Sequence, residues 1–250
     1  MLLSLMTWPE VETHLARGEC AFLSTGSTEQ HGPMGLIGTD TICASTVAEQ
    51  AGALTGAIVA PPIAYTPAPF NTSFPGTISV TPELLSALVG QVCAGLLAQG
   101  FLGVFIVNGH GANLEPIDAA IADLPAGAVT VQSWWNPTPV NDLRTRLYGA
   151  WEGMHATPSE VAITQALHGV RDMGAAIDPP EKLSIDFIRA HSGDRHGPPD
   201  AHRAQFPDGR VGSHSALATP QDGAMLLDLA VKTIAEEFTA FSQTRKTAKL

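Results

Sequence analysis

The sequence predicts an α/β fold in a single layered domain, with a mostly parallel central sheet flanked by helices. Its 250 residues, 44% of them apolar, are enough to bury one substantial core and too few for two ordinary ones. Short β-prone runs alternate with longer helical runs, which is the pattern that buries a parallel sheet between helices. We therefore expect residues 1–250 to form one domain.

Four short β-prone runs predict the strands. They are residues 21–24, 57–60, 104–107 and 129–133. The longer runs that predict helices are residues 41–54, 82–99, 114–123, 158–167 and 220–241. Thr81-Pro82 and Thr219-Pro220 each place a hydroxyl cap before a proline at the first helical position, which defines the starts of two of these helices.

Two stretches, 61–76 and 191–214, do not follow this alternation. The second in particular accumulates Gly, Pro, His and Arg without apolar periodicity. Long loops in a compact domain are usually functional or mobile, and both stretches are expected to be one or the other.

The composition argues against nucleic acid and membrane partners. A formal net charge of -11 and a pI near 5.1 leave no basic face for phosphate backbones or anionic lipid. Residues 1–6 are apolar but lack a basic region, and we expect no apolar run to approach membrane-spanning length. The three cysteines show no CxxC spacing, so we expect a reducing, cytoplasmic location.

The first candidate site segment follows the strand expected at 21–24. Glu29 and His31 lie two residues apart in the loop, and Asp40 arrives at the start of the next helix. Open α/β sheets bind ligands beyond the carboxyl ends of their strands. Two carboxylates and an imidazole suit Zn²⁺, Mn²⁺ or Fe²⁺. The alternative is that Asp40 caps the helix and the other two are solvated loop residues.

The second segment ends the strand expected at 104–107 with the turn Asn108-Gly-His-Gly-Ala-Asn113. Its glycines allow a sharp turn that brings His110 to the same sheet edge as Glu29. A histidine after a strand can also be an ordinary polar loop residue. Complementary ligands at two strand ends favour the metal site.

The third segment carries His155 and Glu160 at a helix start. Thr157-Pro-Ser-Glu160 is also a capping box, in which the glutamate reaches back to the cap amide. Spacing does not distinguish a capping glutamate from a metal ligand, so both readings stay open.

Together these segments resemble the creatininase (creatinine amidohydrolase) family. The resemblance rests on Gly-Ser-x-Glu-Gln-His-Gly-Pro at 26–33 with Thr39-Asp40, on Asn-Gly-His-Gly-x-Asn at 108–113, and on a histidine five before a glutamate at a helix start. Phe-Pro-Gly-Thr at 74–77 is similar to a further family segment. The matches occur in the family's order from about residue 21 to 165.

The resemblance implies two divalent metal ions per subunit, with Zn or Mn expected and Fe as an alternative. Their implied ligands are Asp40 between the metals, Glu29 and His110 on one, and His31 on the other. Creatininase proper has a further glutamate ligand where this chain has Ala112. In relatives with the same departure Glu160 is the natural replacement, and it is also assigned a catalytic role.

The implied reaction is hydrolysis of an amide carbon–nitrogen bond. A metal pair lowers the pKa of bound water from 15.7 towards roughly 7, which supplies hydroxide at neutral pH. His155 is the expected proton donor to the departing nitrogen, because a histidine pKa near 6.5 suits transfer in both directions. The alternative is that His155 only supports the ligands.

The substrate is expected to be a small amide, cyclic or otherwise. Trp135 and Trp151 match positions where creatininase carries tryptophans over its substrate, although tryptophans are more often core residues. Gly111 replaces a tyrosine of creatininase, so creatinine itself is not assumed. The family also includes formamide hydrolases and a peptidase of mycofactocin maturation, and its members commonly form hexamers. Rival interpretations are a mononuclear site, because of Ala112, and a binding protein without metal.

Overall fold

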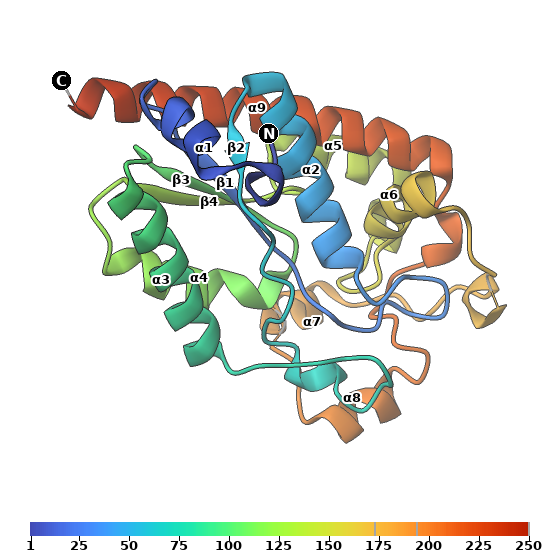
Figure 1. Cartoon of the computed structure of the whole chain (residues 1–250). Helices are drawn as coiled ribbons and strands as arrows, with labels where there is room; N and C mark the ends of the chain where they lie inside the picture. Colours follow the sequence, from blue (N-terminus) through green and yellow to red (C-terminus); the bar gives the residue numbers. More distant parts are fainter. Residues whose placement is uncertain (173, 194, 250) are drawn as a thin grey trace.

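The computed structural model describes all residues except 173, 194 and 250. Its centre is a four-stranded, fully parallel sheet in the order β2-β1-β3-β4 (Figure 1). The strands are β1 (Ala21–Thr25), β2 (Ile58–Val59), β3 (Val104–Asn108) and β4 (Val129–Ser133). The register pairs Thr25 with Asn108 and Asn108 with Ser133, so three strands end level at one sheet edge.

Helices cover both faces of this sheet, as the alternation of short and long runs predicts. On one face lie α2 (Thr39–Thr55), α5 (Thr138–Tyr148), α6 (Pro158–His168) and α9 (Pro220–Lys249). On the other face lie α1 (Trp8–Leu15), α3 (Pro82–Gln99) and α4 (Leu114–Ala122). Figure 1 shows α9 running along the whole first layer.

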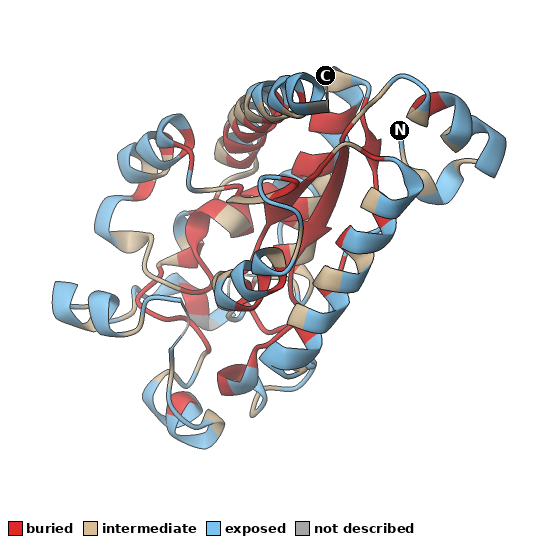
Figure 2. Cartoon of the chain, turned by 90° about the vertical axis from the view of Figure 1, so that its left-hand side faces the viewer, coloured by how far each residue is buried: buried red, intermediate tan, exposed pale blue. Residues whose placement is uncertain are grey.

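Alternate side chains of β1 and β3 supply the two apolar cores. Phe22 and Phe105 pack under α2 and α9, whereas Leu23 and Ile106 face α3 and α4. All four are at most 3% exposed, and Figure 2 shows the burial concentrated on the sheet and the inward faces of the helices. Burying a side chain of this size contributes about 1.5–3 kcal/mol to the stability of the fold. The sheet whose strands end level at this edge is therefore well stabilised.

The four strands and five helices expected from the sequence are all present. The bounds of β4 and α3 agree with the prediction, and the Thr81 hydroxyl accepts the Leu84 amide as an N-cap. β2 is shorter than expected, because the chain continues from this edge strand into Pro61 and Pro62, which have no amide hydrogen for a ladder. α9 continues to Lys249, beyond the last apolar residue of its periodic face.

The prediction missed α1, α5 and two short helices, α7 (Ile185–Ala190) and α8 (Pro199–Gln205). α8 corrects the expectation that 191–214 has no regular structure. It begins at a proline in the first helical position and packs against the 3₁₀ turn Pro69–Asn71, with the Phe70 and His202 rings 5.0 Å apart. The two long loops flagged by the sequence therefore meet.

The expectation that no apolar run reaches membrane-spanning length also needs correction. α3 has 18 residues and a mean hydropathy of 1.2, enough to cross a membrane by length and composition alone. In the fold it lies against β3 and α4, and it buries Leu85, Val89, Cys93 and Leu96 along one face. This spacing of three and four residues is that of a helix packed on a sheet.

Candidate metal centre

The first part of the site is the loop that joins β1 to α2. Glu29 and His31 come from this loop and Asp40 from the first turn of α2, and all three side chains are buried. The loop docks closely on the helix, because Gly26 lies where a Cβ would stand 2.3 Å from the Thr41 Cα. A glycine therefore allows the approach that brings the three candidate ligands together.

The second part is the turn after β3, which two asparagines fold. Asn108 donates to the His110 carbonyl at 2.7 Å and accepts from the Asn113 amide at 3.1 Å, and Asn113 also donates to the Gly26 carbonyl at 2.9 Å. At Gly109 a Cβ would lie 2.2 Å from the Asp40 carbonyl oxygen. The turn formed by Asn-Gly-His-Gly-x-Asn thus places His110 directly beside the start of α2.

The expected ligands converge. His110 Nδ1 lies 3.0 Å from Glu29 Oε1 and 3.1 Å from Asp40 Oδ2, and His31 Nε2 lies 3.0 Å from Asp40 Oδ1. Asp40 therefore has one oxygen toward each histidine. Two of the triads that could hold a cation share Asp40: Glu29, Asp40, His110 and His31, Asp40, Glu160.

Backbone carbonyls orient both histidine rings. His31 Nδ1 donates to the Glu29 carbonyl at 3.1 Å, and His110 Nε2 donates to the Pro67 carbonyl at 2.8 Å. Each bond fixes the tautomer and leaves the other nitrogen facing the carboxylates. Outer hydrogen bonds of this kind are typical of metal-ligating histidines.

The Glu160 carboxylate caps α6 and also lies beside the candidate ligands, which are the two interpretations that the sequence left open. Its Oε1 accepts the Thr157 amide at 2.5 Å, which completes the capping box of α6. The same oxygen lies 3.8 Å from His31 Nε2, within the second triad. Capping and membership of the cluster are therefore compatible in one carboxylate.

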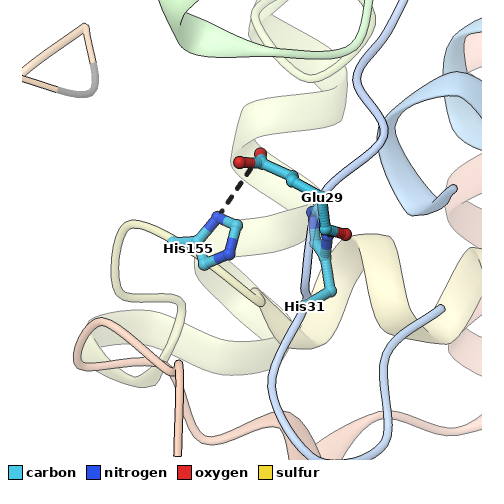
Figure 3. Close-up of side chains that lie close together, drawn as sticks. All are labelled: Glu29, His31 and His155. Atoms are coloured by element: carbon cyan, nitrogen blue, oxygen red, sulfur yellow. Dashed lines mark hydrogen bonds and ion pairs between the residues drawn. The ribbon is translucent and has the colours of Figure 1, made fainter. Parts of the chain in front are cut away.

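His155 faces the same centre from the loop before α6. Figure 3 shows the Glu29 carboxylate pointing toward its ring, and His155 Nδ1 lies 3.9 Å from Glu29 Oε1. Its Nε2 donates to the Gln30 carbonyl at 2.7 Å. Glu29, His31 and His155 form a third group close enough for a cation, so geometry alone also permits His155 as a ligand.

A cavity of about 220 Å³ opens beside the cluster. It is lined by Asp40, His110, His155 and Glu160 and by two of the predicted substrate residues, Gly111 and Trp135. The third, Trp151, is not among the described residues that line it. The Trp151 ring instead packs 5.5 Å from His214 and under Lys182, so its expected place over the substrate is not what the structure describes.

Sequence reasoning missed several polar residues around the site. The fully buried Asn71 donates to Glu29 Oε2 at 2.8 Å and accepts from Gln30 at 2.8 Å, which fixes the Glu29 carboxylate. It lies in the loop 61–76 that the sequence flagged, but no motif marked it. Arg144 lines the cavity and donates to Glu152 at 2.7 Å; it comes from α5, a helix the sequence did not predict.

In the absence of cations, the two histidines His31 and His110 bind protons more tightly than free imidazoles do. Burial alone lowers the pKa of His31, but the carboxylates of Asp40 and Glu160 outweigh it and raise the pKa to about 10. Burial opposes the same effect at His110, whose pKa is also raised by Glu29 and Asp40. Burial raises the pKa of Glu160 to about 7, although His31 pulls it down.

Two oxygens in the cluster fit a cation better than a proton. Glu29 Oε1 and Asp40 Oδ2 are buried, and no donor in the described part of the chain is aligned with either. Both lie within 3.1 Å of His110 Nδ1, so when that nitrogen gives up its proton the lone pairs of three atoms face one another. Buried unsatisfied acceptors are costly, and carboxylate oxygen with imidazole nitrogen is the donor set of Zn²⁺ and Mn²⁺.

Loading the site with Zn²⁺ at pH 7 is expected to release between two and three protons per pair of cations. Glu160 is partly protonated at this pH, and His31 and His110, with their raised pKa values, must each give up a proton to bind metal. Since those pKa values lie above 7, apparent affinity should rise with pH and reach a plateau only near the His31 pKa of about 10. Calorimetric titration in buffers of different ionisation enthalpy measures the release. An observed enthalpy that is the same in every buffer would contradict this.

Glu160→Gln is expected to lower occupancy of the second cation while leaving α6 capped, since glutamine also serves in a capping box. Thr157→Ala is the matched variant: it removes the hydroxyl that accepts the Glu160 amide and keeps the carboxylate. It should cost about 1 kcal/mol of stability and retain the metal. Elemental analysis and thermal melts check both variants, and full metal content in Glu160→Gln would show that Glu160 only caps.

Comparison with known proteins gives a consistent result. The sequence profile of creatininase, described as creatinine amidohydrolase, matches residues 4–238. The chain is 42% identical over 104 residues to a mycofactocin precursor peptide peptidase of Mycolicibacterium smegmatis, covering 39% of this chain and 41% of that protein. It is 36% identical over 107 residues to a 3-dehydro-scyllo-inosose hydrolase of Thermotoga maritima, covering 42% and 34%. The matched segments thus span less than half of these relatives.

Solved structures extend the likeness over nearly the whole chain. A crystal structure of creatinine amidohydrolase (creatininase) superposes with a TM-score of 0.75 at 25% identity and covers 94% of this chain and 95% of that one. Creatininase structures described as manganese and as Zn-Zn forms match with TM-scores of 0.71 and 0.69 at 23% and 24% identity. At that identity these two show the fold alone.

Proposed function

Because the chain belongs to the creatininase family, we propose that it is a divalent-metal-dependent hydrolase that cleaves an amide carbon–nitrogen bond. The observation that supports this best is the convergence of Glu29, His31, Asp40, His110 and Glu160, from three distant stretches, beside one cavity. A rival binding protein without metal would not need two buried carboxylate oxygens aimed at an imidazole nitrogen. We also treat residues 1–250 as one domain, since both cores pack on the same sheet.

In this proposal Glu29 and His110 would hold one cation, His31 and Glu160 would hold the other, and Asp40 would contribute to both. When bound, such a pair activates water and polarises the substrate carbonyl. Asn71 keeps the Glu29 carboxylate in place, and the Pro67 and Glu29 carbonyls keep the two imidazoles facing the pair. The chain thus fixes both the ligands and their tautomers before substrate arrives.

In this proposal His155 transfers a proton from the attacking water to the departing nitrogen. Burial lowers the pKa of His155 to about 3, below the value near 6.5 expected from the sequence, although Glu29 acts in the opposite direction. The ring is therefore neutral at pH 7 and, once protonated, is a strong acid toward the departing nitrogen. Because Nε2–H donates to the Gln30 carbonyl, Nδ1 is the nitrogen free to accept a proton at the cavity. The ring takes that proton as the attacking water loses it and returns it to the departing nitrogen, which balances the hydrolysis.

The substrate class is an amide that reaches a cavity of about 220 Å³ beside Trp135 and Gly111. The match to a mycofactocin precursor peptide peptidase favours a peptide as the second candidate substrate. Formamides remain within the same reaction type. The relative named for 3-dehydro-scyllo-inosose supplies a further compound to test.

The deciding experiment is a substrate panel on protein loaded with Mn²⁺, Zn²⁺ or Fe²⁺. It contains cyclic ureas and lactams, formamides, short peptides and 3-dehydro-scyllo-inosose, with release of amine or acid measured by mass spectrometry. We expect hydrolysis of at least one amide and its loss on chelation. Turnover of the inosose alone would replace the amide assignment, and no turnover with about two metals bound would reject the hydrolase.

We further propose that the chain forms a homo-oligomer. Leu88 on α3 and Tyr65 line the same groove and are 42% and 57% exposed, and Leu84, one turn before Leu88, is 56% exposed. Contiguous apolar surface of this kind is typical of subunit contacts. Light scattering coupled to size exclusion measures the mass. A particle near the 26.1 kDa of one chain would contradict the oligomer.

A further inference from the structure

A second, larger cavity adjoins the candidate metal centre. It measures about 700 Å³ and lies between the first turns of α3 and α4 and the loop 61–76. Its described lining consists mainly of four prolines and three alanines: Pro67, Pro69, Pro82, Pro116, Ala87, Ala112 and Ala119. No family motif and no predicted site residue covers this cavity, except for Ala112.

The two cavities share a wall. Of two consecutive residues in the turn after His110, Gly111 lines the cavity at the metal centre and Ala112 lines the larger one, while Gly193 borders both. The Pro67 carbonyl, from a residue that lines the larger cavity, accepts the His110 Nε2 proton at 2.8 Å. The two cavities therefore lie next to each other, on either side of this short turn.

The lining specifies what can bind there. Proline and alanine present apolar carbon and have few side-chain torsions to restrict on binding, so the surface is largely formed in advance. The charged residues in the described lining are Glu83 and Glu115, both acidic. A neutral apolar group is accommodated by such a surface, whereas a carboxylate is repelled.

We propose that this cavity is a substrate subsite for a neutral, branched apolar group attached to the amide that is cleaved. The substrate class is accordingly an acyl or peptidyl amide with a group of leucine size beside the reacting carbonyl, rather than a bare small ring. The inference rests on the proposed function in one respect: the metal pair is taken as the point that holds the reacting carbonyl.

The test uses hydroxamates, which chelate metal pairs and are not turned over as amides. Acetohydroxamic acid and 4-methylpentanohydroxamic acid differ by four carbons, and glutaric acid monohydroxamate adds a carboxylate instead. Affinities are measured calorimetrically on Zn²⁺-loaded protein. We expect the branched compound to bind at least tenfold more tightly than acetohydroxamate, since a fully buried methylene contributes about fourfold and this groove is partly open. The carboxylate compound should gain nothing.

Ala87→Phe fills the cavity from α3 and should reduce the tenfold preference to below about threefold, with acetohydroxamate affinity unchanged. Ala94→Phe is the control, because Ala94 is exposed on the same helix two turns farther on and does not line the cavity. If Ala87→Phe does not fold, Ala119→Phe on the opposite wall replaces it.

Equal binding of the two neutral hydroxamates, or a preference that survives both phenylalanine variants, would overturn the subsite. Failure of every hydroxamate to bind would overturn it as well, since the subsite is defined relative to the metal pair. A preference that responds to Ala87→Phe in a protein that hydrolyses no amide would keep the subsite and reject the proposed reaction. The two failures are therefore distinguishable.

Discussion

Replacing Asp40 by Asn is expected to remove bound metal and to lower amide hydrolysis by on the order of a thousandfold. Asp40 is the carboxylate common to both triads, with one oxygen toward His31 and the other toward His110. The amide has one carbonyl oxygen and no charge, so it cannot neutralise two cations. A loss of several kcal/mol of electrostatic stabilisation corresponds to this rate effect.

Elemental analysis and steady-state kinetics on the same preparation check the Asp40 variant. Asp118→Asn is the matched control, since Asp118 is exposed on α4 away from the cluster. It should keep about two metals and full activity. Full metal content together with full activity in Asp40→Asn would show that Asp40 is not a shared ligand.

The second large effect is expected from His155→Gln, which should reduce kcat by between about a hundredfold and ten-thousandfold while metal content stays near two. Glutamine can keep a donor near the Gln30 carbonyl, but it has no nitrogen that accepts a proton at neutral pH. The loss should therefore fall on kcat rather than on metal binding.

His168→Gln provides the comparison for His155, because His168 is exposed at the end of α6. It should leave kcat and metal unchanged. Metal lost in proportion to activity in the His155 variant would instead identify His155 as a ligand, in line with its place in the third group of possible ligands.

That the candidate ligands lie together could be predicted from the sequence, because each follows an element whose backbone geometry the sequence indicates. Glu29 and His110 follow buried strands whose carboxyl ends must share an edge in a parallel sheet, and flanking glycines allow close turns. Asp40 follows at a helix start. The same reasoning gave the alternation of strands and helices, since periodicity reports burial directly.

Contacts between distant loops could not be predicted in this way. Asn71 reaches Glu29 across 42 positions, and Arg144 reaches the cavity from a helix that is mostly polar. Trp151 turned toward His214 instead of the cavity, because the rotation of a side chain in an irregular loop depends on neighbours that the local sequence does not specify. Whether Glu160 caps or joins the cluster was also undecidable from spacing, and the fold lets it do both.

The contact between Gly109 and the Asp40 carbonyl sets a limit on how such proteins can diverge. Main-chain atoms at this contact determine the distance between the segment that carries Asp40 and the segment that carries His110. Substitution of neighbouring side chains therefore cannot change this distance without displacing α2. The outer loops, where Phe70 meets His202, carry no such restriction. New substrate specificities are thus expected to arise from changes in these outer loops, while the distance between the segments that carry Asp40 and His110 stays constant.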